Sequence, residues 1–412
     1  MSNMNYISGI KINELRNLKN LDIKLDTNKP VNLIVTGKNG SGKTTLLNAI
    51  FENLLMLTKE FRNIESEKYE IKNYKFEIEK NGNIRYDIEA LKAELRELEE
   101  KYAKCWGKIE LSFPDYASFY NSVKEGKFLL AYYRDNRVPE FKLVNSPAKP
   151  DFSITNWEEN KLSQFLNMLV DYKIQAALAS NEGNNADAEY IKGWFDEFER
   201  MLQQLFEDDN LKLEFNYSNY TFTINTGGKS FMFTQMSAGY NAALDIIADL
   251  VFKMQHEDKI VRAYDMAGIV LIDEIETHLH LELQKKILPL LTTFFPNIQF
   301  IVTTHSPFVL NSQKNTVAYD LEHQESITDL TEYSFDSLAE GYFGVKPESA
   351  ELECRFDRFK QLAEKDNPSQ AEKEEFKRMR EDFEKISDAI APNIKIRYKE
   401  ILNRYLAKED AE

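Results

Sequence analysis

Hydrophobic and polar positions alternate along the first 36 residues in three short runs, which predict three β-strands. The runs read "YISGIKI", "LDIKL" and "VNLIVT", and a period of two places alternate side chains on one face of a sheet. The third run leads through a glycine-rich turn into "KTTLLNAIFENLLML". Apolar residues recur there every three or four positions, so we expect a helix directly after the turn.

Residues 57–104 are strongly charged, and "NGN" at 81–83 divides them in two. This pattern predicts a short helical hairpin with arms of about 20 residues, which would reach only about 30 Å and excludes a long coiled-coil arm. "GKIELSF" and "KFLLAYYR" then predict returning strands, and residues 155–208 predict helices. "LKLEFNYSNYTFTINTGGKSFMF" alternates around "NTGG", which predicts a β-hairpin or meander.

Two largely apolar runs, "AGIVLI" and "IQFIVT", predict buried strands, with helices before and between them. These segments complete an α/β core. Beyond about residue 320 the chain is charged and has the pattern of helices, as in "AEKEEFKRMREDFEKI". We therefore expect a separate C-terminal helical module that binds a partner protein.

Composition restricts the class of protein. The chain has 412 residues with 42% hydrophobic and 12% aromatic content, enough for a packed core. Its longest apolar runs are far shorter than the roughly 20 residues of a membrane span. With only two cysteines a disulfide framework is excluded, and we expect a cytoplasmic protein with no membrane contact.

Net charge limits the contact with nucleic acid. At −16 it disfavours binding by the whole surface. The stretch "KINELRNLKNLDIK" near the start is rich in cations, so a local track for nucleic acid stays open beside the alternative of a solvated sheet face.

"GKNGSGKT" fits the phosphate-loop pattern G-x-x-x-x-G-K-[ST] between a predicted strand and a predicted helix. Its glycines let backbone N–H groups turn toward phosphate oxygens at a helix N-terminus. Lys43 supplies a positive charge, and the Thr44 hydroxyl is a candidate ligand of Mg²⁺. The candidate nucleotide-binding residues of this stretch are Gly37, Asn39, Gly40, Ser41, Gly42, Lys43, Thr44 and Thr45.

Two further strand ends carry candidate chemistry. "GIVLIDE" ends in Asp273 and Glu274, where the first acid can hold Mg²⁺ and the second can polarise an attacking water. "IQFIVTTHSP" ends at His305. A histidine there is either an ordinary loop residue or a sensor of the γ-phosphate, and the order phosphate loop, Asp-Glu strand, His strand favours the sensor.

The stretch "MSAGYNAALDIIADL" places Ser237 and Gly239 at the start of an apolar-periodic helix. A hydroxyl, free N–H groups and the positive end of a helix dipole can form an anion site, or merely an N-cap. Since the chain already has one phosphate cradle, a second is most useful on the ATP of another copy. Symmetric pairing would then bury two ATP molecules between two copies.

Together these motifs resemble those of the ABC-type ATPases of the SMC, RecF and repair group, and most of all the compact bacterial ATPases of the Septu, retron and overcoming-lysogenization defence groups. The resemblance covers roughly residues 1–50 and 230–312. It implies an α/β fold: a P-loop ATPase head with a mixed β-sheet lobe, a helical lobe, a short helical-hairpin insertion and a C-terminal helical appendage. It also implies that ATP and Mg²⁺ are bound. Glu274 is then the catalytic base, His305 the switch histidine, Ser237 and Gly239 the signature acting across a dimer, and residues 276–278 the D-loop.

The sequence departs from that family at the signature, where Met236, Ala238 and Tyr240 replace the usual residues. This departure predicts slow turnover. The glutamine of the family's Q-loop has no clear counterpart, and Arg134 and Asn136 are weak substitutes. No fused nuclease motif is apparent, so the effector is expected to be a separate polypeptide.

We therefore expect an ATP-hydrolysing regulatory ATPase of a bacterial antiphage system, which pairs head to tail or forms higher oligomers around ATP and holds a separate nuclease or toxin. The alternative is a DNA repair or recombination clamp similar to RecF and SMC. The expected parts are an N-terminal core section (1–56), the hairpin (57–104), a helical lobe with β elements (105–230), a second core section (231–319) and the C-terminal module (320–412).

Overall fold

The computed structural model describes residues 5–80, 92–99, 108–154, 156–255, 266–328, 330–335, 337–338, 349–365, 367–386 and 392–409. The chain divides into two compact units, Met1–Phe335 and Asp336–Glu412. Each unit has its own cluster of buried hydrophobic side chains.

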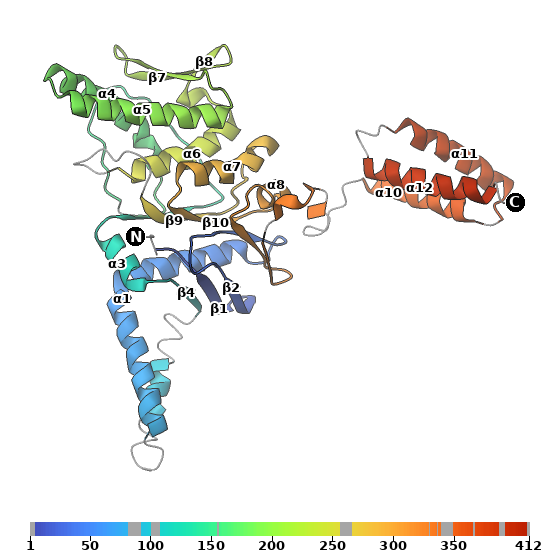
Figure 1. Cartoon of the computed structure of the whole chain (residues 1–412), viewed down its shortest axis with the longest axis horizontal. Coiled ribbons are helices and arrows are strands. Elements are labelled where there is room, and N and C mark those ends of the chain that lie inside the picture. Colours follow the sequence, from blue (N-terminus) through green and yellow to red (C-terminus); the bar gives the residue numbers. More distant parts are fainter. Residues whose placement is uncertain are drawn as a thin grey trace. The chain divides into compact units, whose positions relative to one another are not determined.

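A mostly parallel sheet forms the centre of the first unit (Figure 1). Its described strands lie in the order β12 (Glu325–Thr328), β11 (Thr316–Asp320), β3 (Asn32–Thr36), β10 (Ile298–Thr303), β9 (Ala267–Ile272) and β5 (Phe128–Tyr133). Only β12 runs antiparallel to its neighbour among them. β3, β5, β9 and β10 are buried along their whole length. The sequence predicts this for β9 and β10, whereas the run of β3 was expected to alternate and to be buried on one face only.

Strand β12, at one edge of this sheet, corrects the prediction that the chain is helical beyond about residue 320. β12, with the sequence "ESIT", pairs with β11 in a register that joins Val317 to Thr328. The four residues of β12 are mostly exposed and too short to give a clear alternation. The first compact unit therefore ends at Phe335, rather than at residue 319 where we expected the core to end.

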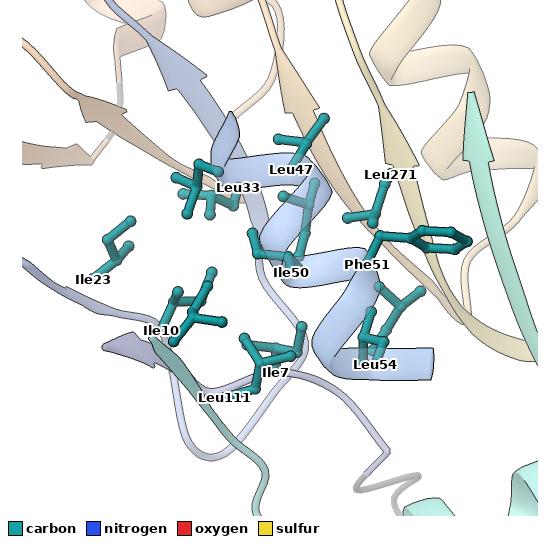
Figure 2. Packing of buried hydrophobic residues seen from close by; sticks show 14 of the residues in the cluster. Ile7, Ile10, Ile23, Leu33, Leu47, Ile50, Phe51, Leu54, Leu111 and Leu271 are labelled. Atoms are coloured by element: carbon teal, nitrogen blue, oxygen red, sulfur yellow. The ribbon is translucent and has the colours of Figure 1, made fainter. Parts of the chain in front are cut away.

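Helix α1 (Lys43–Lys80) begins at the phosphate loop and packs between two sheets. The second sheet is antiparallel, with β2 (Leu18–Lys24), β1 (Gly9–Leu15) and β4 (Ile109–Ser112). Figure 2 shows the packing side chains: Leu47, Ile50 and Leu54 of α1, Ile10, Ile23 and Leu111 of the antiparallel sheet, and Leu33 and Leu271 of the central sheet. Burial of each such side chain contributes roughly 1.5–3 kcal/mol, so the start of α1 is held firmly.

Beyond the core, α1 continues as one uninterrupted helix to Lys80 (Figure 1). The first arm of the predicted hairpin is thus an extension of α1 rather than a separate helix. Residues 92–99 return alongside it, where Tyr74 donates a hydrogen bond to Glu94 at 2.9 Å and Lys75 pairs with Glu99 at 2.8 Å. The rest of the predicted hairpin, residues 81–91 and 100–104, lies outside the described residues.

Helices cover the other side of the central sheet. They are α4 (Leu162–Asn181), α5 (Asn185–Phe206), α6 (Ala238–Lys253) and α7 (Leu281–Phe294), and α6 packs against β5, α4 and α7. The predicted meander is a three-stranded antiparallel sheet of β6 (Lys212–Asn216), β7 (Thr221–Thr226) and β8 (Lys229–Met232). Two short helices, α3 (Tyr116–Lys124) and α8 (Pro307–Leu310), complete the elements that concern us in this unit. Within the described parts of the chain, no helix is long and apolar enough to cross a membrane.

The second unit contains the helices α10 (Ala350–Glu364), α11 (Gln370–Lys385) and α12 (Pro392–Glu409). Its core is aromatic, with Phe356, Phe359, Phe383 and Tyr398 buried together. Ser349 and Ser369 cap α10 and α11 by accepting backbone N–H bonds. The helical character that the sequence predicts for the C-terminal part is therefore confirmed for α10, α11 and α12.

Candidate nucleotide-binding site

The central sheet brings three chain segments to one edge. β3, β10 and β9 are parallel neighbours, so their carboxyl ends lie side by side. The phosphate loop follows β3, the Asp-Glu pair follows β9, and Thr304 and His305 follow β10. Ligands of open α/β sheets bind at this edge.

The phosphate loop has the backbone shape that its glycines allow. Gly37 has φ 138° and Gly42 has φ 106°, which strain other residues. A Cβ atom on Gly37 would lie 2.9 Å from Ser41 Oγ. From the β1–β2 turn, Asn17 Nδ2 donates to the Ser41 carbonyl at 3.1 Å and supports the loop. No motif in the sequence indicates this role for Asn17, which lies 24 residues before Ser41.

Lys43 lies inside the loop. Its Nζ donates to the carbonyls of Gly37 at 3.0 Å and Lys38 at 3.3 Å. Burial lowers the pKa of Lys43, and the charges of Glu274, Asp273 and Glu276 oppose that shift. These carboxylates are therefore close enough to act on the lysine electrostatically.

Asp273 and Glu274 form the acidic side of the site. Asp273 is fully buried, and its Oδ1 accepts a 2.5 Å hydrogen bond from the Thr303 hydroxyl. Its Oδ2 is buried with no hydrogen-bond partner among the described residues. A buried carboxylate oxygen without a partner is costly, and an oxygen of this kind is what Mg²⁺ prefers as a ligand. The site thus fits Mg²⁺, with Thr44 exposed at the start of α1 as a second oxygen donor.

Glu274 has an environment that favours proton uptake. Burial raises the pKa of Glu274, and the neighbouring charges of Glu276 and Asp273 raise it further. Its backbone N–H donates to Thr303 Oγ1 at 2.8 Å. A carboxylate with a raised pKa is a better proton acceptor near neutral pH than an ordinary one.

Glu276 ties the segment after β9 to the segment after β10. Its carboxylate accepts hydrogen bonds from the Thr304 hydroxyl at 2.7 Å and the His305 N–H at 2.5 Å. Burial and the charge of Lys43 lower the pKa of His305, so the neutral imidazole is favoured at pH 7. Lys43, Asp273, Glu274 and His305 are therefore brought together at one edge, as the order of their motifs predicts, and Glu276 lies with them.

The predicted signature residues lie at the start of α6. Ser237 is exposed, and its side chain makes no cap bond to the helix. Gly239 is buried against residues 278–280, because a Cβ atom there would lie 2.9 Å from His280 Cδ2. The described residues show no hydrogen bond from Ser237 to the phosphate loop of the same chain, so the contact predicted across a dimer stays a prediction.

A pocket of about 1120 Å³ opens beside the phosphate loop. Its lining includes Thr44, Thr45 and Asn48 of α1, Arg16 of the β1–β2 turn, and Arg134 after β5. The volume suits a small-molecule ligand. Asn48 and Arg16 were not predicted from the sequence, because only the packing of the antiparallel sheet on α1 puts them beside the loop.

Arg134, a weak candidate for the Q-loop position, lies in this pocket. Its guanidinium donates to Asn48 Oδ1 at 3.1 Å and to Glu158 Oε1 at 2.5 Å, and it stacks over Tyr132. Asn136 is exposed, as is Asn39 on the phosphate loop. Arg134 is thus held between Asn48 of α1 and the carboxylate of Glu158.

The cations of the N-terminal strands are matched by acids. Lys19 pairs with Glu14 at 2.5 Å, and Lys11 lies between Asp22 and Glu110 in the strand register. A face of alternating charges attracts phosphate backbones less than a row of cations does. This pairing therefore argues against the nucleic-acid-binding surface that the sequence left possible.

The chain is similar to one protein family model and to several curated proteins. Residues 33–311 match the family model described as "AAA domain, putative AbiEii toxin, Type IV TA system". The chain is 24% identical over 394 residues to the Septu protein PtuA of Bacillus mycoides (strain KBAB4), covering 92% of this chain and 50% of the relative. It is 26% identical over 237 residues to the Retron Vc95 probable ATPase of Vibrio cholerae serotype O1 biovar El Tor, covering 55% and 42%.

The chain spans about half the length of these curated relatives or less. The Septu protein PtuA of Bacillus thuringiensis matches with 25% identity over 321 residues, which is 75% of this chain and 74% of that protein. Among solved structures, an Smc head bound to the C-winged helix domain of ScpA matches with 12% identity and a TM-score of 0.37, covering 78% of this chain and 96% of that one.

Proposed function

The chain belongs to the AAA-domain family whose model it matches over residues 33–311, and we propose that it is a slow ATP-hydrolysing regulatory ATPase of an antiphage defence system. In this proposal it closes around ATP as a head-to-tail dimer or higher oligomer and holds or activates a separate nuclease or toxin effector. The names of the Septu and retron relatives support the defence setting. One observation carries the activity: within the described parts of the chain Asp273 Oδ2 is buried without a hydrogen-bond partner, at the sheet edge where the charges of Glu274 and Asp273 act on Lys43.

Each residue of the site has a chemical role in this proposal. The N–H groups of the glycine loop and the charge of Lys43 hold the phosphates of ATP. Thr44 and Asp273 would hold Mg²⁺, which neutralises charge on the phosphate oxygens. Glu274 orients a water and accepts its proton. His305 senses the γ-phosphate as the neutral imidazole.

The second copy has a role because Ser237 is exposed at a helix N-terminus. A hydroxyl and free N–H groups there can bind the γ-phosphate of ATP held by the other copy. Ala238, which replaces a residue of the family signature, removes nothing from these N–H groups. The proposed dimer therefore forms only when ATP is present.

ATP turnover by the purified full chain tests the activity. Glu274→Gln keeps the size of the side chain but cannot accept a proton, so turnover should fall at least about 100-fold while ATP binding is retained. Glu189→Gln on α5, which is exposed and remote from the site in sequence, should leave turnover unchanged. Equal turnover of Glu274→Gln and the unmodified protein would show that the assigned base is wrong.

The DNA clamp stays as the alternative function. The paired cations of β1 and β2 support the effector-holding proposal over this alternative. ATP-dependent DNA binding that weakens steeply with salt would favour the clamp. DNA binding that is absent, or indifferent to ATP, would count against it.

A further inference from the structure

Arg137 binds the backbone of the Asp273–Glu274 turn. Its Nη1 donates to the carbonyl of Asp273 at 2.9 Å and to that of Arg134 at 2.9 Å. Its Nη2 donates to the carbonyl of Glu274 at 3.2 Å. One guanidinium thus holds both carbonyls of the acidic pair, and a planar fork of donors suits this geometry in a way that a lysine does not.

The backbone of the Asp273–Glu274 turn is strained. Glu274 has φ 43°, a left-handed conformation that costs a residue with a side chain roughly 1–2 kcal/mol. Thr303 holds the opposite side of the turn, because its hydroxyl accepts from the Glu274 N–H at 2.8 Å and donates to Asp273 Oδ1 at 2.5 Å. Arg137 holds the carbonyls and Thr303 holds the amide. The direction of the Glu274 side chain depends on both.

A second acid acts on Arg137 from α6. Burial lowers the pKa of Arg137, and the charge of Asp245 is the largest influence that raises it. Asp245 is fully buried, and its Oδ1 accepts from Asn160 Nδ2 at 2.6 Å. Its Oδ2 is buried with no hydrogen-bond partner among the described residues. An unpaired carboxylate oxygen therefore lies within electrostatic reach of the guanidinium that holds the turn.

Asp245 and Ser237 are parts of the same helix region. Ser237 is the N-cap of α6, and Asp245 lies eight residues farther along, about 12 Å along the axis. A shift of α6 along its axis carries both residues because a packed helix moves as a rigid element. Helix α6 thus carries both Ser237, which is proposed to meet a second copy, and Asp245, whose charge acts on Arg137.

We propose that Arg137 is a positioning residue for ATP hydrolysis, which fixes the Asp273–Glu274 turn and is itself oriented by Asp245 of α6. This inference rests on the proposed function, and it adds the route by which contact at Ser237 reaches Glu274. When α6 shifts on pairing, Asp245 Oδ2 gains an N–H of Arg137, and the Glu274 carboxylate turns with its backbone. Arg137 itself touches neither the phosphates nor the water.

The first test separates positioning from binding. In the full chain, Arg137→Gln should lower kcat roughly 10- to 100-fold, as loss of a supporting hydrogen bond does, while KM for ATP changes less than about threefold. Arg137→Lys keeps the charge but loses the fork, so it should recover only part of kcat. Arg200→Gln on α5, an exposed arginine, is the matched control and should leave both constants unchanged. A kcat of Arg137→Gln equal to that of the unmodified protein would overturn the proposal.

The role of Asp245 is tested by combining variants. If Asp245 acts through Arg137, the kcat losses of Asp245→Asn and Arg137→Gln should not multiply in the double variant, because the second change removes an interaction already lost. Losses that multiply would show that Asp245 acts elsewhere. Thermal unfolding of each variant shows whether the protein is still folded.

A second readout does not require hydrolysis and so keeps this inference distinct from the proposed function. The N–H groups of Ile275, Thr277 and Leu279 are bonded within and beside the turn, and their hydrogen–deuterium exchange reports its opening. Arg137→Gln should speed exchange in a peptide over residues 273–279 at least about tenfold, and Arg200→Gln should not. Unchanged exchange would refute the holding role even in a chain that hydrolyses ATP. Absent hydrolysis with faster exchange would refute only the proposed function.

Discussion

Replacing the buried acid Asp245 by asparagine is predicted to stabilise the folded protein. The side chain is fully buried, and burial is the largest of the influences that raise its pKa to about 6 from its usual 3.8. The hydrogen bond from Asn160 and the charges of Arg137 and Lys253 lower the pKa, and the charge of Asp249 raises it. Asp245→Asn resembles the protonated acid in shape and hydrogen bonding. We therefore expect this variant to be more stable than the unmodified protein at neutral pH.

The size of the effect follows from the pKa. The folded state keeps the proton up to about pH 6 and the unfolded state loses it near pH 3.8, so rising pH destabilises the folded protein across this window. Two pKa units at about 1.4 kcal/mol each give about 3 kcal/mol at pH 8, and about half of that at pH 5. For a unit of this size, 3 kcal/mol corresponds to roughly 4 °C in Tm.

Denaturant unfolding of Asp245→Asn and the unmodified chain at pH 8 and pH 5 measures the difference. The gain in the free energy of unfolding should shrink by about half at the lower pH. Asp249→Asn, one turn farther along α6, is the matched control with the opposite sign. Its carboxylate pairs with Lys253 at 2.7 Å and accepts from the Tyr133 hydroxyl at 2.6 Å, so its loss should cost about 3–5 kcal/mol. Equal or lower stability of Asp245→Asn at pH 8 would refute the reasoning.

Three other predictions concern the site. The raised pKa of Glu274 predicts that kcat/KM falls as the pH drops through a value above the ordinary 4.5. Glu276→Gln removes a negative charge that raises the pKa of Glu274, so this variant should move the acidic limb of the pH profile to lower pH. Gly37→Ala should weaken ATP binding at least about tenfold in a titration with labelled nucleotide, because φ 138° is strained for alanine and its Cβ would meet Ser41 Oγ. Ser237→Arg should abolish the dependence of turnover on protein concentration but leave ATP binding by single copies intact, and a dependence that persists would contradict the contact across a dimer.

The parts of the site that the sequence predicts are those carried by local motifs. Lys43 follows a glycine pattern, and Asp273 and His305 each follow an apolar run long enough to be a buried strand. Parallel strands put their carboxyl ends at one edge, so three separate motifs become one site without any knowledge of the packing. The order of the three motifs in the chain was sufficient to predict that they form one site.

The supporting residues could not be predicted in this way. Arg137 and Asp273 are 136 residues apart, and Asn160 and Asp245 are 85 apart, and no periodicity in the sequence reports such a pairing. β12 was missed because four mostly exposed residues carry no pattern. The length of α1 was missed because charged residues form an exposed helical arm as readily as they form a separate helix.

Capture of the effector tests the central claim most directly. Tagged Glu274→Gln protein, produced from its native locus with the neighbouring genes, is purified with ATP and Mg²⁺, and its companions are identified by mass spectrometry. A parallel purification of Glu274→Gln combined with Ser237→Arg shows whether retention requires pairing. The account predicts a nuclease or toxin subunit in stoichiometric amount, retained with ATP and lost without it. Nucleic acid with no protein companion would contradict it and favour the DNA clamp.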